Sequence, residues 1–198
     1  MDYFSIFLNQ INQRIEIETV ETVSVIQNKV QDRSDFIIQC SEEIQKIYKT
    51  YGAFNVKWRC KSLPLKGYIN FVPLDELEFE HNRLLENIVD IEENLIENQE
   101  VVVEDIKHWY PVFLFPNGDS FCYDIRNEKI VFFEHDVFDT GINLHGLVIA
   151  QNIDKLFETW SQIWFVDIYD WYEAVDEFGI QLDKPIFYAL IELINNVF

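Results

Sequence analysis

Three consecutive residues, Glu134, His135 and Asp136, are of the types that could hold a metal ion or transfer a proton. His108 and His145 could supply a further ligand or base. A metal-dependent phosphohydrolase needs several histidines and carboxylates that converge on one pocket, whereas these three residues lie at the end of an expected strand. The pattern favours a strand end with His135 hydrogen-bonded to a neighbouring loop. We therefore expect no enzymatic activity, no metal and no cofactor.

Motifs that would indicate other chemistry do not occur in the sequence. There is no GxxxxGK[ST], GxGxxG, GxSxG or HExxH. A glycine-rich nucleotide cradle, a hydrolase nucleophile elbow and a helical zinc site therefore lack the residues that build them.

Four tryptophans, Trp109, Trp160, Trp164 and Trp171, could form a box for a flat ligand. Their positions follow helix and strand spacing, which is typical of a packed core. Asp124 is less ordinary because it lies inside an apolar strand, where a carboxylate must find donors or remain at the surface. We expect the tryptophans to pack in the core and Asp124 to cap a loop or turn.

The charge of the chain limits its partners. Fifteen basic and thirty-five acidic residues give a formal net charge of −20. Such a field repels nucleic acid and anionic lipid, and it attracts basic proteins and speeds their association. We expect a basic protein partner, with neither nucleic acid nor membrane. An acidic proteome from a salt-rich habitat would produce the same excess without any partner.

The cysteines and the first residues bear on the compartment. Cys40, Cys60 and Cys122 form an odd number without CxxC spacing, which favours reduced thiols over disulfides or a zinc site. The opening MDYFSIFLNQINQ lacks the features of a signal peptide, and no apolar run approaches the length of a membrane span. We therefore expect a cytoplasmic protein.

The stretch from Trp109 to Asp136 predicts three strands joined by two tight turns. Asn117 and Gly118 favour a type I′ turn, and Asn127 with Glu128 would form the second turn. That turn predicts the register Ile125 opposite Ile130, Tyr123 opposite Phe132 and Phe121 opposite Glu134. Ser120, Cys122 and Asp124 then share the other face with Val131, Phe133 and His135.

Residue spacing also predicts the remaining elements. Helices are expected over 3–15, 41–52, 76–105, 152–164 and 185–198, and strands over 15–27, 54–60 and 67–72, with another strand opening at 101–103. Ser41 and Asn152 are expected N-caps, and Gly52 is an expected helix end. We expect one α+β domain over 1–198, with a core at about 41–165 and a helical C-terminal extension at 167–198.

The segment from Glu76 to Asp105 is strongly acidic. It contains eleven acidic residues and one basic residue, Arg83, so it carries −10 of the net −20. Its apolar residues keep helical spacing, which predicts an amphipathic helix with an anionic face. That face is either a solvated helix surface or a partner site.

Several motifs together resemble the SUKH superfamily, which includes fungal cell-wall-assembly regulators of the Smi/Knr type and bacterial immunity proteins. They span residues 41–165 in order. The matching positions are Tyr48 to Gly52, Phe71 to Leu77, Pro111, Phe113, Phe115, Gly118, Asp119, Asp124, Val131, His135 and Asp136.

The resemblance implies a central antiparallel sheet of about 5–6 strands flanked by helices, without enzymatic activity. It also implies a bacterial immunity protein that neutralises a cognate basic toxin domain of the nuclease type. The alternative is a regulatory scaffold with an endogenous partner. We expect a monomer, or a dimer through the C-terminal helix. The expected partner-binding residues are Glu86, Asp90, Glu92, Glu93, Glu97, Asp119, Glu134, Asp136 and Asp139.

Overall fold

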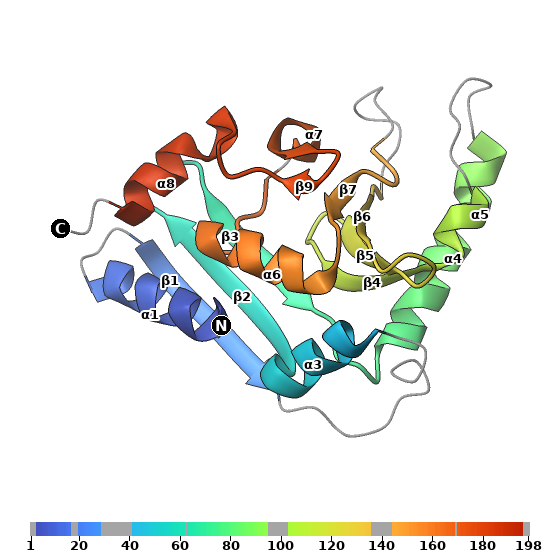
Figure 1. Ribbon diagram of the computed structural model, residues 1–198, viewed down its shortest axis with the longest axis horizontal. Coiled ribbons are helices and arrows are strands. Elements are labelled where there is room, and N and C mark those ends of the chain that lie inside the picture. The colour runs from blue at the N-terminus through green and yellow to red at the C-terminus, as the bar shows by residue number, and fades with distance from the viewer. Residues whose placement is uncertain are drawn as a thin grey trace.

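The computed structural model describes residues 3–16, 20–28, 41–61, 63–94, 103–135, 144–168 and 170–195. Within these ranges one antiparallel sheet curls through the molecule, and helices lie along it (Figure 1). This confirms the α+β class that the sequence predicts.

The sheet has nine strands in the described residues, more than the five or six expected. Its order is β1-β2-β3-β4-β5-β6-β7-β9-β8. The additional strands come from β1, which precedes the expected core, and from a short hairpin inside the extension that was expected to be helical. The bounds are β1 Val20–Asn28, β2 Ala53–Cys60, β3 Lys66–Phe71, β4 Trp109–Leu114, β5 Ser120–Asp124, β6 Ile130–Phe133, β7 Val148–Ala150, β8 Val175–Asp176 and β9 Gly179–Ile180.

The helices divide between the two faces of the sheet. Residues of α1, α3, α6 and α8 share the large core with the inner face, whereas α4 and α5 cover the outer face of β4–β6. The bounds are α1 Tyr3–Glu16, α3 Glu42–Tyr51, α4 Leu77–Asn94, α5 Val103–Ile106, α6 Ile153–Trp160, α7 Trp171–Ala174 and α8 Tyr188–Asn195, with 3₁₀ turns η1 Ser161–Ile163 and η2 Pro185–Phe187.

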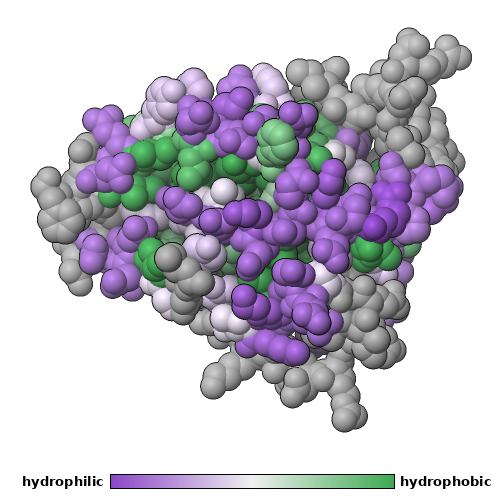
Figure 2. Space-filling view, in the orientation of Figure 1, coloured by the Kyte–Doolittle hydropathy of each residue, from purple (hydrophilic) through white to green (hydrophobic). Residues whose placement is uncertain are grey.

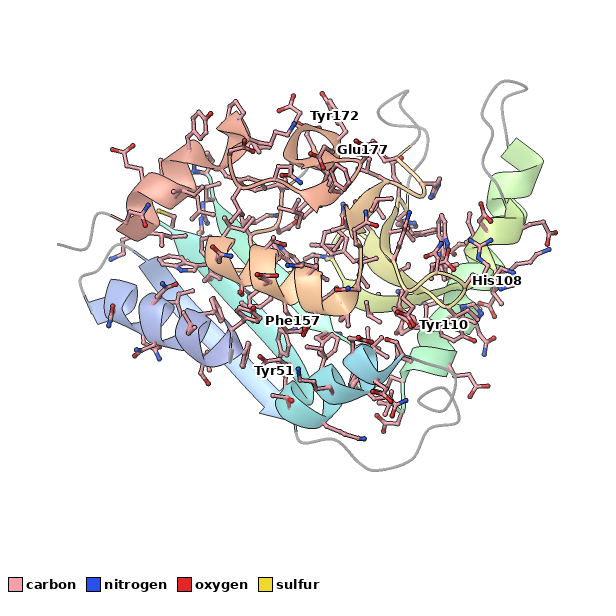
Figure 3. All side chains as sticks on the ribbon, viewed as in Figure 1. Tyr51, His108, Tyr110, Phe157, Tyr172 and Glu177 are labelled. Atoms are coloured by element: carbon pink, nitrogen blue, oxygen red, sulfur yellow. The ribbon has the colours of Figure 1, made fainter. Side chains whose placement is uncertain are left out.

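The large core is built mainly of aromatic rings. Phe71 of β3 lies 4.8 Å from Phe113 of β4 between ring centroids. Tyr51 of α3 and Phe157 of α6 stack face to face, with centroids 5.1 Å apart (Figure 3). Tyr48 of α3 stacks on Phe71 of the sheet with centroids 4.6 Å apart. Burial of each such ring contributes about 1.5–3 kcal/mol, so ring packing helps to hold the helices to one another and to the sheet.

The two ends of the sheet differ on the outer face. A second cluster, made of Leu84, Ile106, Trp109, Cys122, Val131 and Phe133, fills the space between α4 and strands β4–β6. Every residue of β5 and β6 is therefore buried. In β2 and β3, by contrast, buried and exposed residues alternate, because their outer face has no such cover among the described residues.

Two expected helix starts are confirmed. The Ser41 hydroxyl accepts a hydrogen bond from the Ile44 amide at 3.4 Å, and the Asn152 side chain accepts one from the Lys155 amide at 2.8 Å. Gly52 follows the last residue of α3, and its amide donates to the Tyr48 carbonyl. The caps satisfy amides that the helices leave without an internal partner.

The expected type I′ turn between β4 and β5 is wrong. Gly118 has a φ of +96°, but Asn117 is not among the residues with positive φ. The Gly118 amide donates to the Phe115 carbonyl and the Phe115 amide to the Asp119 carbonyl. Pro116 therefore occupies the first central position of a type I turn, which suits its fixed φ, and Gly118 takes the left-handed position that follows.

The expected register of the β5–β6 hairpin is wrong by two residues, although the expected faces are right. Tyr123 lies opposite Ile130 and Phe121 opposite Phe132. A shift of two keeps every side chain on its face. The connection is longer than expected because the Asp124 amide and carbonyl close it, and Glu128 adopts a φ of +65°.

The acidic segment 76–105 is not described as one helix. Its first part forms α4, and residues 95–102 lie outside the described part of the chain. The prediction of a strand that opens at 101–103 is wrong for Val103, because α5 begins at this residue. The expected helix through Trp164 ends earlier, because α6 passes into η1 and Trp164 turns left-handed with a φ of +56°.

Candidate partner-binding surface

Glu134 and His135, directly after β6, hold the end of this strand to neighbouring loops. Glu134 is buried, and its amide donates to His145 Nδ1 at 3.3 Å. The His135 amide donates to Asp119 Oδ1 at 2.7 Å. The His135 ring lies against Gly118, where a Cβ would come within 2.2 Å of it. These contacts fix the β4–β5 turn to the end of β6, in agreement with the expected strand end.

The protonation of His145 fits this structural role. Burial lowers the pKa of His145 to about 4, so its ring is neutral at neutral pH and can accept the Glu134 amide proton. In the part of the chain that the structure describes, no group of three His, Cys, Asp or Glu side chains is arranged to hold a metal ion. Asp136 lies outside the described residues.

Asp124 caps the β5–β6 turn, as the sequence suggests. Its carboxylate accepts hydrogen bonds from the Arg126 amide, the Arg126 guanidinium and the Trp109 indole. Burial acts to raise the pKa of Asp124, but these bonds and the charge of Arg126 outweigh burial and lower it. Arg126 also pairs with Asp105 of α5, so one guanidinium ties the turn to that helix.

The expectation that the tryptophans pack in the core is confirmed. Trp109, Trp160, Trp164 and Trp171 are all at most 5 % exposed. Their indole N–H groups are used internally where hydrogen bonds are described: Trp160 donates to the Val166 carbonyl at 2.8 Å. No flat-ligand box is needed to account for these residues.

Two of the three cysteines behave as packing residues. Cys60 and Cys122 are buried. Burial raises the pKa of the Cys122 thiol to about 12, which removes its nucleophilic form at neutral pH. Cys40 lies outside the described residues.

The expected partner-binding acids do not form one described surface. Glu86 is exposed on α4, Asp119 is half-buried and holds the His135 amide, and Glu134 is only 6 % exposed, so it does not belong to the surface. The remaining expected residues fall where side chains or positions are not described: Asp90, Glu92 and Glu93 lie on α4 without described side chains, and Glu97, Asp136 and Asp139 lie outside the described residues.

A second acidic surface lies on α7 and the β8–β9 hairpin, at the edge of the sheet. Two aromatic residues project from it: Tyr172 is 44 % exposed and Phe178 is 66 % exposed. Tyr172 and Glu177 mark this region in Figure 3. We call it the acidic-aromatic surface, and it consists of Asp170, Tyr172, Glu173, Asp176, Glu177 and Phe178, all of which are exposed.

The hairpin that carries this surface is held firmly. Asp176 lies opposite Gly179, so Glu177 and Phe178 form its tip. The Asp176 carboxylate accepts the Phe178 amide at 2.8 Å, and Gln151 donates to the Glu177 carbonyl at 3.0 Å. Gly179 has a φ of +114° and leaves no room for a Cβ, which would lie 2.5 Å from the Ile149 carbonyl oxygen. The tip is therefore presented in a fixed position.

Buried aromatic residues anchor the same segment. Trp171 is 1 % exposed, and its ring lies 4.7 Å from that of Phe121 on β5. Neighbouring positions along α7 therefore divide between the core and the surface. Seen from the side drawn in Figure 1, hydrophilic residues cover much of the molecule, and an apolar stretch lies beside α8 (Figure 2).

The sequence shows that 167–178 is acidic and aromatic, but the expected partner-binding residues include none from this segment. Between Asp167 and Asp183 there are six acidic residues and no basic residue, a signal that the larger acidic segment before it obscured. The sequence does not distinguish the exposed Phe178 from the buried Trp171, because strands of two residues have no readable period.

The chain matches no family model, no curated protein and no solved structure. Among the helices that the structure describes, none is both long enough and apolar enough to cross a membrane.

Proposed function

We propose that this chain is a non-enzymatic protein-binding module that takes a basic protein as its partner through the acidic-aromatic surface. The observation that supports the proposal is the exposure of Phe178 and Tyr172 among four exposed carboxylates, two at α7 and two on the β8–β9 hairpin. Exposed aromatic residues are common anchors of protein interfaces, and a rigid anchor loses little entropy on binding. The carboxylates around them favour a partner with a cationic surface.

The net charge of −20 supports the same choice of partner. Long-range attraction increases the association rate of a basic protein, and it decreases as salt screens it. The charge alone does not locate the interface, since acidic residues occur throughout the chain. Two exposed rings on one firmly held segment distinguish the α7 and β8–β9 region from α4, where one ring, Phe79, is 65 % exposed beside Glu78.

We further propose that the partner is a toxin domain of the nuclease type, and that the chain is a cytoplasmic immunity protein. A nuclease needs a basic groove for its phosphates, and an acidic protein can occupy that groove in their place. The resemblance to SUKH immunity proteins supports this role. A regulatory scaffold with an endogenous basic partner is the alternative.

Co-expression in a bacterial host tests the proposal. The toxin domain encoded beside the gene for this chain is expressed alone and together with the chain, and growth is measured. Restored growth, together with a complex of the two purified proteins, is the expected result. If no toxin reading frame lies beside the gene, or if the chain does not restore growth, the immunity role is wrong and the scaffold role is favoured.

Charge reversal then locates the interface. The double variant Glu173→Lys/Glu177→Lys is expected to bind the toxin domain at least tenfold more weakly and to show a smaller dependence of affinity on salt. The matched variant Glu78→Lys/Glu86→Lys makes the same change in charge on α4, where both residues are exposed. A larger loss from the α4 variant would place the interface on α4 instead.

A further inference from the structure

The outer face of β2 and β3 carries a group of cations on this acidic protein. Lys57 and Arg59 are exposed on β2, and Lys66 is exposed on β3 next to Tyr68, which is 37 % exposed. The alternate residues of β2, Val56, Trp58 and Cys60, belong to the large core. The pleat of the strands therefore directs the cations to the side opposite the helices of that core.

These residues line an open pocket with a volume of about 400 Å³. Pro116, from the β4–β5 turn, forms part of its wall. The pairing of β3 with β4 involves only Asn70 and Phe71 on β3, so the first half of β3 has no β4 partner beside it. The pocket thus lies where the sheet leaves a gap between β3 and the turn that carries Pro116.

A glycine and a tryptophan fix the backbone at the pocket. Gly67 lies opposite Trp58 in the β2–β3 register, and a Cβ on Gly67 would lie 2.1 Å from the Trp58 indole nitrogen. The indole therefore lies across the glycine, and it donates to the Trp164 carbonyl at 2.7 Å. This packing holds β2 and β3 in position beneath the exposed cations.

The local charge of the pocket is positive although the protein is acidic. Lys66 pairs with Asp167 at 3.4 Å, and Glu21 on β1 lies opposite Arg59 in the register. Lys57 lies opposite Ser24 and Tyr68, with its Nζ 5.0 Å from the Tyr68 ring centroid. With Asp167 and Glu21 counted against the three cations, a net charge of +1 remains (3 − 2). Carboxylates farther away than the Debye length, about 8 Å at physiological salt, are largely screened.

We propose that this pocket binds a small organic anion that joins a phosphate group to a flat ring, of the size of one nucleoside monophosphate. Its volume of about 400 Å³ is in the range of small-ligand sites. Lys57, Arg59 and Lys66 supply donors for the phosphate oxygens, and Tyr68 and Pro116 supply flat apolar contacts for the ring. A longer nucleic acid is not expected to bind, because its phosphates beyond the pocket would lie against the rest of the surface of a chain with a net charge of −20.

Titration of the purified full chain tests this pocket without reference to any protein partner. Adenosine 5′-monophosphate, inorganic phosphate, adenosine and a short oligonucleotide are added separately, and binding is measured by calorimetry and by amide chemical shifts. The monophosphate is expected to bind at least tenfold more tightly than either phosphate or adenosine, with shifts on β2, β3 and the Pro116 turn. Absence of saturable binding overturns the proposal, as does tighter binding of an oligonucleotide than of the monophosphate.

Variants assign the binding to the pocket. Lys57→Gln/Arg59→Gln is expected to weaken binding of the monophosphate at least tenfold, and Tyr68→Ala is expected to remove its advantage over inorganic phosphate. The matched control Lys46→Gln/Lys49→Gln removes two exposed lysines from α3 and should leave the affinity unchanged. Equal losses in the two double variants would show that net charge, rather than the pocket, governs binding, and would overturn the proposal.

Discussion

The acidic-aromatic surface projects from the molecule, whereas the pocket lined by Lys57, Arg59, Lys66 and Tyr68, here called the cationic pocket, is concave. Both combine charged and aromatic residues. Each has at least one exposed aromatic residue among charges that are mainly of one sign. Phe178 projects from the tip of a hairpin, whereas Tyr68 belongs to the wall of a pocket with a volume of about 400 Å³. A projecting ring can enter a partner's groove, and a concave wall can surround a small ligand.

The cover on the sheet explains why the two regions differ. At β4–β6 the outer face is covered by α4 and α5. The acidic-aromatic surface lies at the edge of the sheet, with β8 and β9. At β2 and β3 the outer face keeps alternating exposed residues, and these form the pocket. One sheet can therefore carry two separate charged regions, and the following predictions test that separation.

The largest expected effect comes from removing a buried carboxylate that belongs to neither region. Asp124→Ala leaves Arg126 and the Trp109 indole without their buried acceptor and should lower the free energy of unfolding by about 3 kcal/mol. Chemical denaturation measures this loss. The monophosphate affinity of the remaining folded protein should not change, and a change would show that the β5–β6 turn is coupled to the pocket.

The pH dependence of the same effect has a definite sign. The pKa of Asp124 is lowered in the folded protein, so its carboxylate stabilises the fold above the ordinary carboxyl pKa of about 4. That stabilisation is lost as the pH falls through the lowered pKa. The difference between wild type and Asp124→Ala should therefore narrow below pH ~4; a constant difference down to strong acid would contradict the lowered pKa.

His145 should produce the next largest effect, at higher pH. Its folded pKa of about 4 lies below the ordinary histidine value, so its neutral form stabilises the fold above that ordinary value, and this is lost as the pH falls. Wild type should lose up to about 2 kcal/mol more than His145→Asn between pH 7 and 5. Asparagine keeps an acceptor for the Glu134 amide but does not titrate, and parallel pH profiles would contradict the buried neutral ring.

Phe178→Ala tests the acidic-aromatic surface alone. The ring is 66 % exposed, so its loss should change the free energy of unfolding by less than about 0.5 kcal/mol. Affinity for the basic toxin domain should fall about tenfold, which corresponds to about 1.4 kcal/mol, because an interface anchor is removed. Binding of adenosine 5′-monophosphate should be unchanged in the same preparation.

The smallest expected effect is a gain. Asp167→Asn removes the carboxylate that pairs with Lys66, so the ammonium group becomes available to a phosphate. Calorimetry should show affinity for the monophosphate rising about threefold, in line with the modest value of an ion pair whose lysine is exposed. Weaker binding in this variant would mean that Asp167 positions Lys66 rather than competing for it.

Much of the fold could be predicted because its signals are local. Ser41 and Asn152 each mark a helix start within four residues, and alternating apolar residues mark β2, β3 and β5. The sequence predicts the position of the turn at Gly118 but not its type, because Pro116 takes the first central position that the prediction gives to Asn117. Local signals of this kind do not specify register.

The candidate sites depend on contacts that the sequence does not show. Lys66 and Pro116 are fifty positions apart, and only the sheet brings them to one pocket. Strands β8 and β9 have two residues each, too few for a period, so the position of Phe178 at a hairpin tip could not be anticipated. The acidic composition predicts attraction of basic partners, but it does not show which acidic side chains are exposed, and Glu134 is buried.

The central claim is that the acidic-aromatic surface binds a basic protein, and one measurement tests it most directly. Calorimetric titration of the neighbouring toxin domain into wild type, Glu173→Lys/Glu177→Lys and Glu78→Lys/Glu86→Lys gives three affinities at each of several salt concentrations. The account predicts the largest loss and the smallest salt dependence for the Glu173/Glu177 variant. Unchanged affinity in that variant would contradict it.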